Sequence, residues 1–202
     1  PFDELVASAY MNRVQLSAAG FYKTPKIHWD RATGRGHPFY YFAYGASCSE
    51  VTIDTHTGEY LVDRVDILHD VGYSLNPAVD LGQVEGGFIQ GMGWLTTEEL
   101  WWDQKGQLRT HAPSTYKIPV ASDVPPVFNV RLAEWSVNKE PTIGRSKAVG
   151  EPPLMLAISV VEALSMAVAS EADYRVAPQL DTPVTPERVL MGVERMRRER
   201  AA

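Results

Sequence analysis

One carboxylate stands where acid–base chemistry would be possible. Glu151 directly precedes Pro152 in the segment Ser146–Leu154. A residue before proline is disfavoured in the helical region, so we expect Glu151 to be extended, at the start of a buried helix. Burial would raise the pKa of its carboxyl group, and the helix N-terminus would lower it. Such opposed influences can tune a general base. On the residues alone, a plain helix cap is the simpler interpretation.

Glycines crowd a second segment that is otherwise patterned as a helix. Leu81–Trp94 contains five of them, at positions 82, 86, 87, 91 and 93. Each costs about 1 kcal/mol relative to alanine inside a helix, so close approach of another backbone or of a ligand must offset the loss. Gln83 and Gln90 would then offer amide groups to a polar ligand. Tight helix packing with solvated glutamines is the alternative that the pattern favours.

Several familiar catalytic patterns are missing from the sequence. No two of the five histidines have the i, i+4 spacing of a helical zinc site. Gly45–Ser49 lacks the closing glycine of a nucleophile elbow, and Gly91–Gly93 lacks the third glycine of a dinucleotide fingerprint. No P-loop occurs. Cys48 is the only cysteine, which excludes an internal disulfide and a cluster held by this chain's cysteines alone, and indicates a reducing compartment.

Apolar periodicity predicts the elements that must position these residues. Helical spacing covers Phe2–Ala19, and further helices are expected at about Pro77–Thr97, Pro152–Ser170 and Pro186–Arg198. Residues 21–37 are expected to form an exposed loop. Alternating aromatic and β-branched residues predict strands at Tyr40–Tyr44, Cys48–Asp54, Tyr60–Leu68, Glu99–Trp102, Gln107–Thr110 and Phe128–Trp135. Turns at Thr57-Gly58 and Asp103–Gly106 make two hairpins. Without strict β–α–β alternation, the fold class is α+β.

The composition is that of an acidic globular protein. Lys and Arg number 19 against 25 Asp and Glu, a net charge of −6, and 45% of the residues are hydrophobic. This balance argues against nucleic acid or anionic lipid as a partner. The longest apolar stretch, Leu154–Ala169, is short and interrupted, so no membrane element is expected. We predict a single unit over residues 1–202, with an exposed tail at 175–202 that carries a short helix. The chain opens on Pro1, as a piece of a longer protein would.

Five sequence strings closely resemble the xanthine dehydrogenase/oxidase family of molybdenum hydroxylases. They recur in order and are Gly36–Ala46, Asp66–Gly72, Gly82–Gly86, Pro113–Pro119 and Lys147–Pro153. The similarity runs from about Pro1 to Tyr174. It implies an α+β fold that forms the C-terminal subdomain of the molybdenum-binding region, with a molybdopterin cofactor buried between two subdomains. The pterin dithiolene would hold the molybdenum, so no metal-ligating side chain is expected.

The same resemblance assigns roles to individual residues. The glutamate of Gly-Glu-Pro-Pro is the family's general base and matches Glu151, which would take a proton as a water-derived oxygen attacks the purine ring. The glutamine of Gly-Gln-x-Glu-Gly contacts the pterin and matches Gln83. Gly150 and Lys147 would line or shape the same pocket. No family role transfers to Cys48, which we expect to be a small buried residue.

The resemblance also implies a reaction and partners. Residues 113–119 and 148–153 keep the strings of xanthine-type enzymes, which favours oxidation of hypoxanthine and xanthine to urate over an aldehyde or other N-heterocycle substrate. A non-catalytic assembly domain is the alternative from another class. Complete family enzymes carry two [2Fe–2S] clusters and FAD, pass electrons to NAD or oxygen, and usually form dimers. We therefore expect a cytoplasmic enzyme, and an isolated chain that is inactive without the upstream domains.

Overall fold

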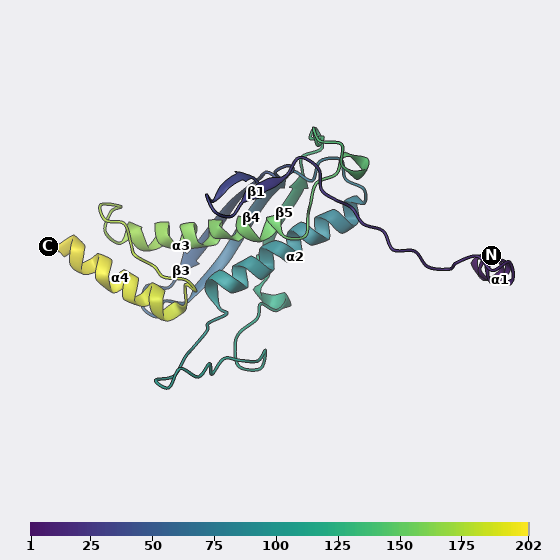
Figure 1. The fold of residues 1–202 in the computed structure, drawn as a ribbon. Helices are drawn as coiled ribbons and strands as arrows, with labels where there is room; N and C mark the ends of the chain where they lie inside the picture. The colour runs from purple at the N-terminus through teal and green to yellow at the C-terminus, as the bar shows by residue number, and fades with distance from the viewer. Residues whose placement is uncertain (202) are drawn as a thin grey trace. The chain divides into compact units, whose positions relative to one another are not determined.

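The computed structural model describes residues 1–201 (Figure 1). Contacts within the chain divide it into two units, Pro1–Tyr40 and Tyr41–Ala202, where the sequence predicted one unit over residues 1–202. The physical reason for the division is burial, because no side chain of residues 1–40 is buried. The two units are described separately below.

The first unit contains one helix and one small hairpin. Helix α1 covers Phe2–Met11 and is shorter than expected. Strands β1 (His28–Asp30) and β2 (Arg35–His37) pair antiparallel within the segment that we expected to be a loop. The Asp30 carboxylate stabilises the turn between the two strands. It accepts hydrogen bonds from the Ala32 amide at 2.9 Å and from the Thr33 hydroxyl at 2.6 Å.

The second unit is built on a three-stranded sheet. Strands β3 (Gly45–Ile53) and β4 (Tyr60–His69) form the predicted antiparallel hairpin, with a bulge between Glu50 and Val51. Strand β5 (Val127–Leu132) pairs with β4 in parallel, in the order β3-β4-β5. The second predicted hairpin is reduced to an isolated bridge between Trp102 and Leu108. Tyr40–Tyr44 forms no strand.

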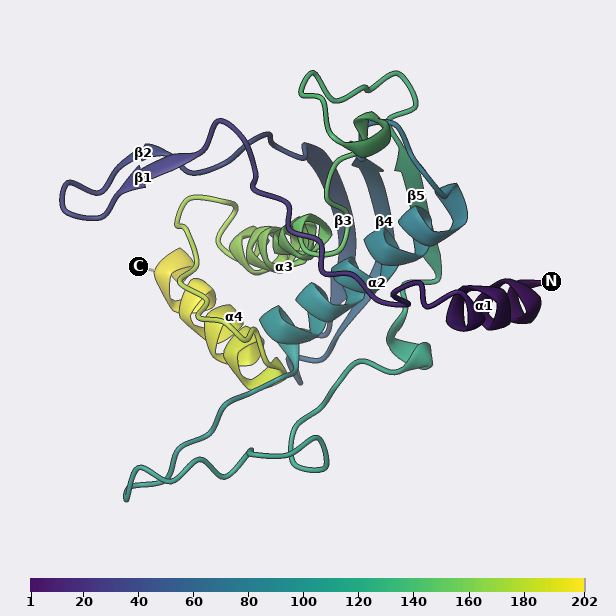
Figure 2. The same ribbon diagram turned by 45° about the vertical axis from the view of Figure 1, so that its right-hand side comes forward.

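Helices cover one face of this sheet (Figure 2). Helix α2 (Pro77–Thr96) links β4 to β5. The predicted helix from Pro152 consists of a 3-10 helix, η3 (Pro152–Ala157), followed by α3 (Ile158–Ser170). Helix α4 spans Pro186–Ala201, and short 3-10 turns occupy Ala121–Asp123 (η1) and Ile143–Arg145 (η2). The α+β class is confirmed.

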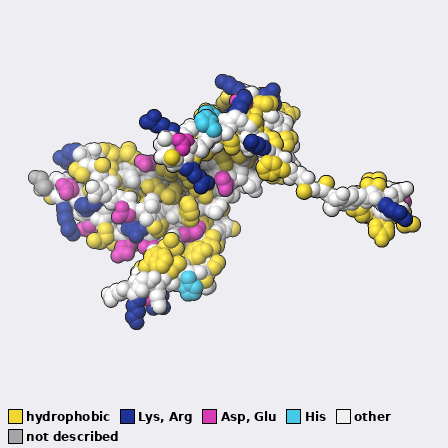
Figure 3. All heavy atoms as spheres, viewed as in Figure 1, with side chains coloured by type: hydrophobic (Ala, Val, Ile, Leu, Met, Phe, Trp, Pro, Cys, Tyr) yellow, Lys and Arg dark blue, Asp and Glu magenta, His cyan; other side chains and the backbone are white. Residues whose placement is uncertain are grey.

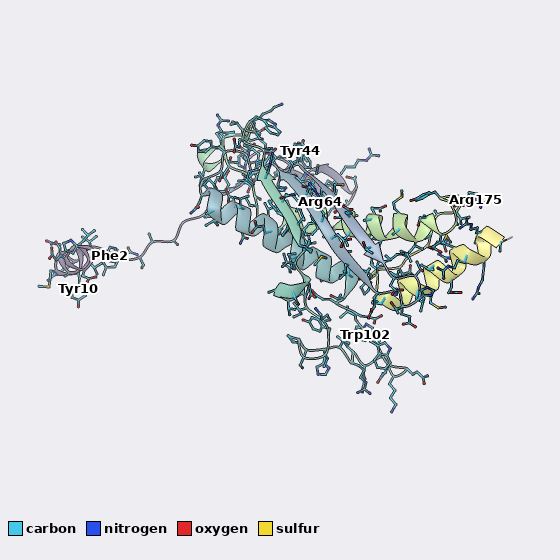
Figure 4. All side chains as sticks on the ribbon, turned by 180° about the vertical axis from the view of Figure 1, so that it is seen from behind. Phe2, Tyr10, Tyr44, Arg64, Trp102 and Arg175 are labelled. Carbon is cyan, nitrogen blue, oxygen red and sulfur yellow. The ribbon has the colours of Figure 1, made fainter. Side chains whose placement is uncertain are left out.

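The core lies between the sheet and the helices. Val65 and Ile67 of β4 pack among buried residues of the helices, and the rings of Phe88 and Phe128 lie 5.5 Å apart between α2 and β5. The opposite face of the sheet is mixed, with Arg64 (Figure 4) paired to Asp66 and with Leu68 partly exposed beside them. Hydrophobic burial thus fixes the sheet to α2 and α3, the elements that position the candidate site.

The C-terminal helix belongs to the core, which corrects the expected exposed tail. One face of α4 is fully buried, through Val189, Val193 and Met196, and α4 packs against α3. The hydroxyl of Tyr60 donates a 2.7 Å hydrogen bond to the carbonyl of Val184, just before this helix. The i, i+4, i+7 spacing of the three buried side chains explains why the helix docks along one face.

The segment Pro152–Ser170 is long and apolar enough to cross a membrane by length and composition, with a mean hydropathy of 1.8. In the structure it changes from 3-10 to α-helix at Ile158. Val160, Leu164 and Val168 on its inner face are fully buried in the core. Burial explains only part of its apolar composition, because Met155, Ile158 and Met166 are exposed.

Exposed aromatic side chains mark the long connection between α2 and β5. Trp101 and Trp102 are more than half exposed there. Figure 3 shows hydrophobic side chains gathered on this loop, and Figure 4 shows Trp102 on it, away from the sheet. High β-propensity without burial explains why the predicted hairpin is limited to one bridge and the backbone hydrogen bonds beside it.

Candidate functional site

Glu151 lies where the sequence predicts it, at the start of the helical segment, but not in the predicted conformation. It is the N-cap residue of η3, with φ −100° and ψ −40°, which is helical rather than extended. The preference of a residue before proline is overridden here by the packing of η3 on α2. The Glu151 carboxylate makes no capping hydrogen bond, is exposed, and has no hydrogen bond or ion pair within residues 1–201. Its position therefore has no capping explanation.

Gln83 lies on the first half of α2 and next to the Glu151 segment. Pro77 begins this helix, and the side chain of Asn76 accepts a hydrogen bond from the Val79 amide at 3.4 Å. A methyl group placed on Gly150 would lie 3.6 Å from Oε1 of Gln83. The structure thus brings two of the predicted pocket residues together, across 67 positions of the sequence (150 − 83).

The glycines of α2 divide into two kinds of contact. A methyl group on Gly91 would lie 2.4 Å from the carbonyl oxygen of Leu154, and one on Gly87 would lie 3.1 Å from Pro153. These two glycines let the backbone of η3 approach the helix. Gly82 and Gly86 have no such neighbour within 4 Å among residues 1–201. Bare backbone therefore lies open on the helix beside Gln83.

Lys147 does not present its ammonium group to an open pocket. Its Nζ atom forms an ion pair with Asp70, and the two side chains are only 8% and 12% exposed. The same carboxylate accepts hydrogen bonds from the Ser136 hydroxyl at 2.6 Å and from the Gly72 amide at 2.8 Å. Nζ also lies 5.1 Å from the ring centroid of Tyr44. Lys147 is thus held in the interior, next to the site.

The environment of Asp70 favours its charged form. Burial alone raises the pKa of this carboxyl group, but the hydrogen bonds from Lys147, Ser136 and Gly72 together with the Lys147 charge hold the pKa below its ordinary value. Sequence reasoning missed Asp70 and Ser136 as members of the site. The available signal was the string Asp66–Gly72, which contains Asp70.

His69 is a buried histidine without a hydrogen-bond partner. It is 1% exposed, and neither ring nitrogen has a partner within residues 1–201. Burial lowers the pKa of the imidazole and the Lys147 charge lowers it further, while Asp70 opposes both. The ring is therefore neutral near pH 7, and its unpaired polar atoms oppose folding.

Replacing His69 by leucine should raise the free energy of unfolding, by about 1 kcal/mol at pH 7.5, because it removes unsatisfied buried polar atoms. The gain should grow towards pH 5.5. Below about pH 6.5 the unfolded imidazole takes up a proton that the folded one resists, so the wild type loses stability as the pH falls. Denaturant titration at both pH values measures this. The exposed His56→Leu change is the control, and a leucine at 69 that destabilises at both pH values would contradict the explanation.

Side-chain metal ligands do not cluster in the part of the chain that is described. Residues 1–201 contain no group of three or more His, Cys, Asp or Glu that could hold a metal ion. Cys48 is exposed, contrary to expectation. The alternation of β3 explains this, because Ser47 and Ser49 on either side of Cys48 face α3 and hydrogen-bond to Ser159.

The residues that are present fit a flat polar cofactor. A glutamine amide both donates and accepts hydrogen bonds, as the edge of a pterin requires. The bare backbone at Gly82, Gly86 and Gly150 leaves room beside that amide. The free carboxylate of Glu151 follows Gly150 directly. This arrangement can bind a planar group at Gln83 and move a proton at Glu151.

Comparison with known proteins identifies relatives that are similar over most of the chain. A xanthine dehydrogenase of Oryza sativa subsp. japonica is 48% identical over 201 residues, which cover 94% of this chain and 14% of the relative. A xanthine dehydrogenase/oxidase of Rattus norvegicus is 49% identical over 194 residues, with the same coverage. The chain therefore spans about 14% of the length of these relatives.

Solved structures share the fold. The quinoline 2-oxidoreductase of Pseudomonas putida 86 superimposes with a TM-score of 0.63 and 31% identity, covering 71% of this chain and 18% of that one. The aldehyde oxidoreductase of Desulfovibrio gigas gives a TM-score of 0.68 and 25% identity, covering 93% of this chain and 20% of that one. Residues 1–125 match the family described as the molybdopterin cofactor-binding domain. The chain belongs to this molybdopterin cofactor-binding domain family.

Proposed function

We propose that this chain supplies the catalytic base and part of the pterin pocket of a molybdenum hydroxylase that oxidises hypoxanthine and xanthine to urate. The observation that carries the proposal is the free carboxylate of Glu151, which follows Gly150 where that residue meets Gln83. Relatives that are 48% and 49% identical are named for xanthine, which supports a purine substrate. A fold shared with a quinoline and an aldehyde oxidoreductase leaves those substrate classes as the alternative.

Each residue of the site has a distinct task in this reaction. Bound molybdopterin supplies the two-electron redox chemistry. Gln83 binds the edge of the cofactor through its amide, and Gly150 leaves the space that a side chain would fill. Glu151 accepts a proton as the water-derived oxygen adds to the electrophilic carbon of the purine ring. A methyl group on Gly150 would lie 3.6 Å from Oε1 of Gln83, so the residue before the proposed base lies beside the proposed cofactor contact.

The remainder of the enzyme must supply what this chain lacks. The relatives are about seven times longer. We propose that their other regions provide the upstream part of the molybdenum-binding region, two [2Fe–2S] clusters and FAD. Electrons would then pass to NAD or oxygen in a cytoplasmic enzyme that forms dimers. The isolated chain should be inactive, because it holds only part of the pocket.

A substrate panel on the full-length enzyme tests this proposal. Hypoxanthine, xanthine, quinoline and an aromatic aldehyde are compared by kcat/KM, with the molybdenum content of each preparation measured. We expect the two purines to be the best substrates and urate to be the product, and activity to disappear with the metal. A higher kcat/KM for quinoline or the aldehyde would move the enzyme to the alternative class. Full activity without molybdenum would contradict the proposal itself.

A further inference from the structure

We propose that Asp70 and Lys147 are positioning residues for Glu151, because their buried ion pair fixes the chain segment that leads to the catalytic carboxylate. This inference rests on the proposed function of Glu151 as the base. Neither side chain needs to touch cofactor or substrate for this role. Both are almost completely enclosed by the chain itself.

Backbone hydrogen bonds show that this segment is held along the end of β4. Ser146 forms an antiparallel bridge with Gly72, and the amide of Lys147 donates to the carbonyl of Val71 at 2.8 Å. The next amide, that of Ala148, donates to the hydroxyl of Tyr41 at 2.9 Å. The register of residues 146–148 is therefore fixed on both sides of the Lys147 side chain.

The ion pair selects this register more than it stabilises the fold. Taking two charges out of water costs several kcal/mol, which their attraction repays only when every hydrogen-bonding site is filled. Asp70 comes close to that condition, because Ser136, Gly72 and Lys147 all donate to it. A register slip would leave a lone buried charge. By contrast, the pair of Arg175 and Asp173 is 64% and 54% exposed, and such pairs contribute little.

The segment is too short to absorb a displacement before it reaches the base. Only Ala148, Val149 and Gly150 lie between Lys147 and Glu151. Val149 packs against the hydrophobic core, so the segment is packed up to Gly150, the residue directly before the base. Movement at Lys147 is therefore passed on to the Glu151 carboxylate. A misplacement of about 1 Å at a reacting group can lower the rate about 10²-fold.

The test uses the full-length, molybdenum-loaded enzyme with Lys147→Met, and Arg175→Met as the control for loss of an exposed ion pair. We expect Lys147→Met to lower kcat by roughly 10- to 100-fold with KM nearly unchanged and the molybdenum content retained. Amide hydrogen exchange in residues 145–151 should become faster. Arg175→Met should change neither quantity. Unchanged kcat, or unchanged exchange in that segment, overturns the inference.

A double variant separates positioning from the penalty of a lone buried charge. Lys147→Met with Asp70→Asn leaves no buried charge, so the free energy of unfolding should recover towards that of the wild type. The anchor stays absent, so kcat should stay low. Full recovery of kcat in the double variant would overturn the inference.

Two further variants keep the test decisive. Tyr41→Phe removes the acceptor for the Ala148 amide without creating a buried charge, so this variant should fold even if Lys147→Met does not. We expect its loss of kcat to be smaller than the loss expected for Lys147→Met. Unchanged kcat in Tyr41→Phe then overturns the inference. Glu151→Gln reports on the proposed function separately. If Glu151→Gln is inactive while Lys147→Met is fully active, only the positioning role fails, and if Glu151→Gln is active, the proposed function fails.

Discussion

Replacing Glu151 by glutamine in the full-length enzyme should lower kcat by roughly 10²- to 10⁴-fold, the usual contribution of a general base. Glutamine keeps the size of the side chain but cannot accept the proton. Folding should be unaffected, because the carboxylate has no hydrogen bond or ion pair within residues 1–201 and makes no cap on η3. Molybdenum content should stay at the wild-type level, and steady-state kinetics with xanthine measures the loss.

Glu187 provides a matched control for this change. It is also an exposed glutamate at the beginning of a helix, in the first turn of α4. Glu187→Gln should therefore leave kcat and metal content unchanged. A Glu151→Gln enzyme with wild-type turnover would show that another group takes the proton. Loss of molybdenum together with turnover would instead indicate a binding role for Glu151.

Local sequence signals predicted the elements that form from neighbouring residues. The β3–β4 hairpin follows from alternating side chains around Thr57-Gly58, and α2 follows from Pro77 and the helical spacing after it. The parallel pairing of β4 with β5 was not predicted, because it depends on residues that α2 and a long loop separate. Trp101 and Trp102 have strand propensity, but they are more than half exposed and the expected hairpin is limited to the bridge between Trp102 and Leu108.

In the candidate site, too, the sequence identified individual residues but not the contacts between distant ones. The string resemblance pointed to Glu151 and Gln83, and the structure shows Gly150 next to Gln83. The partner of Lys147 could not be inferred, because Asp70 lies 77 positions away. The sequence therefore predicts only that Lys147 lines or shapes the pocket, and the structure adds that its Nζ atom pairs with Asp70. The sequence showed five glycines in this segment, but not that Gly87 and Gly91 are the ones that meet η3.

Adding one methyl group at Gly91 should disrupt the packing of η3 on α2, and η3 is the helix that follows Glu151. In Gly91→Ala the new Cβ would lie 2.4 Å from the carbonyl oxygen of Leu154 and 2.9 Å from Cβ of Ala157. The first contact is with backbone, so no rotamer change can relieve it. We expect overpacking to destabilise the contact between α2 and η3 by about 1–3 kcal/mol. Hydrogen exchange in Pro77–Thr96 and Pro152–Ala157 should then be roughly 10- to 100-fold faster in the full-length enzyme.

Gly86→Ala is the control that distinguishes a steric clash with η3 from the effect of alanine on helix propensity. A methyl group there meets no neighbouring atom within 4 Å among residues 1–201, so Gly86→Ala should slow exchange in α2 through its better helix propensity. Equal disruption by both variants would contradict the packing explanation. Because Glu151 begins η3, the shift forced by Gly91→Ala should also move the carboxylate and lower kcat. On this argument Gly91 would affect catalysis through the packing of η3 on α2, without contacting a ligand itself.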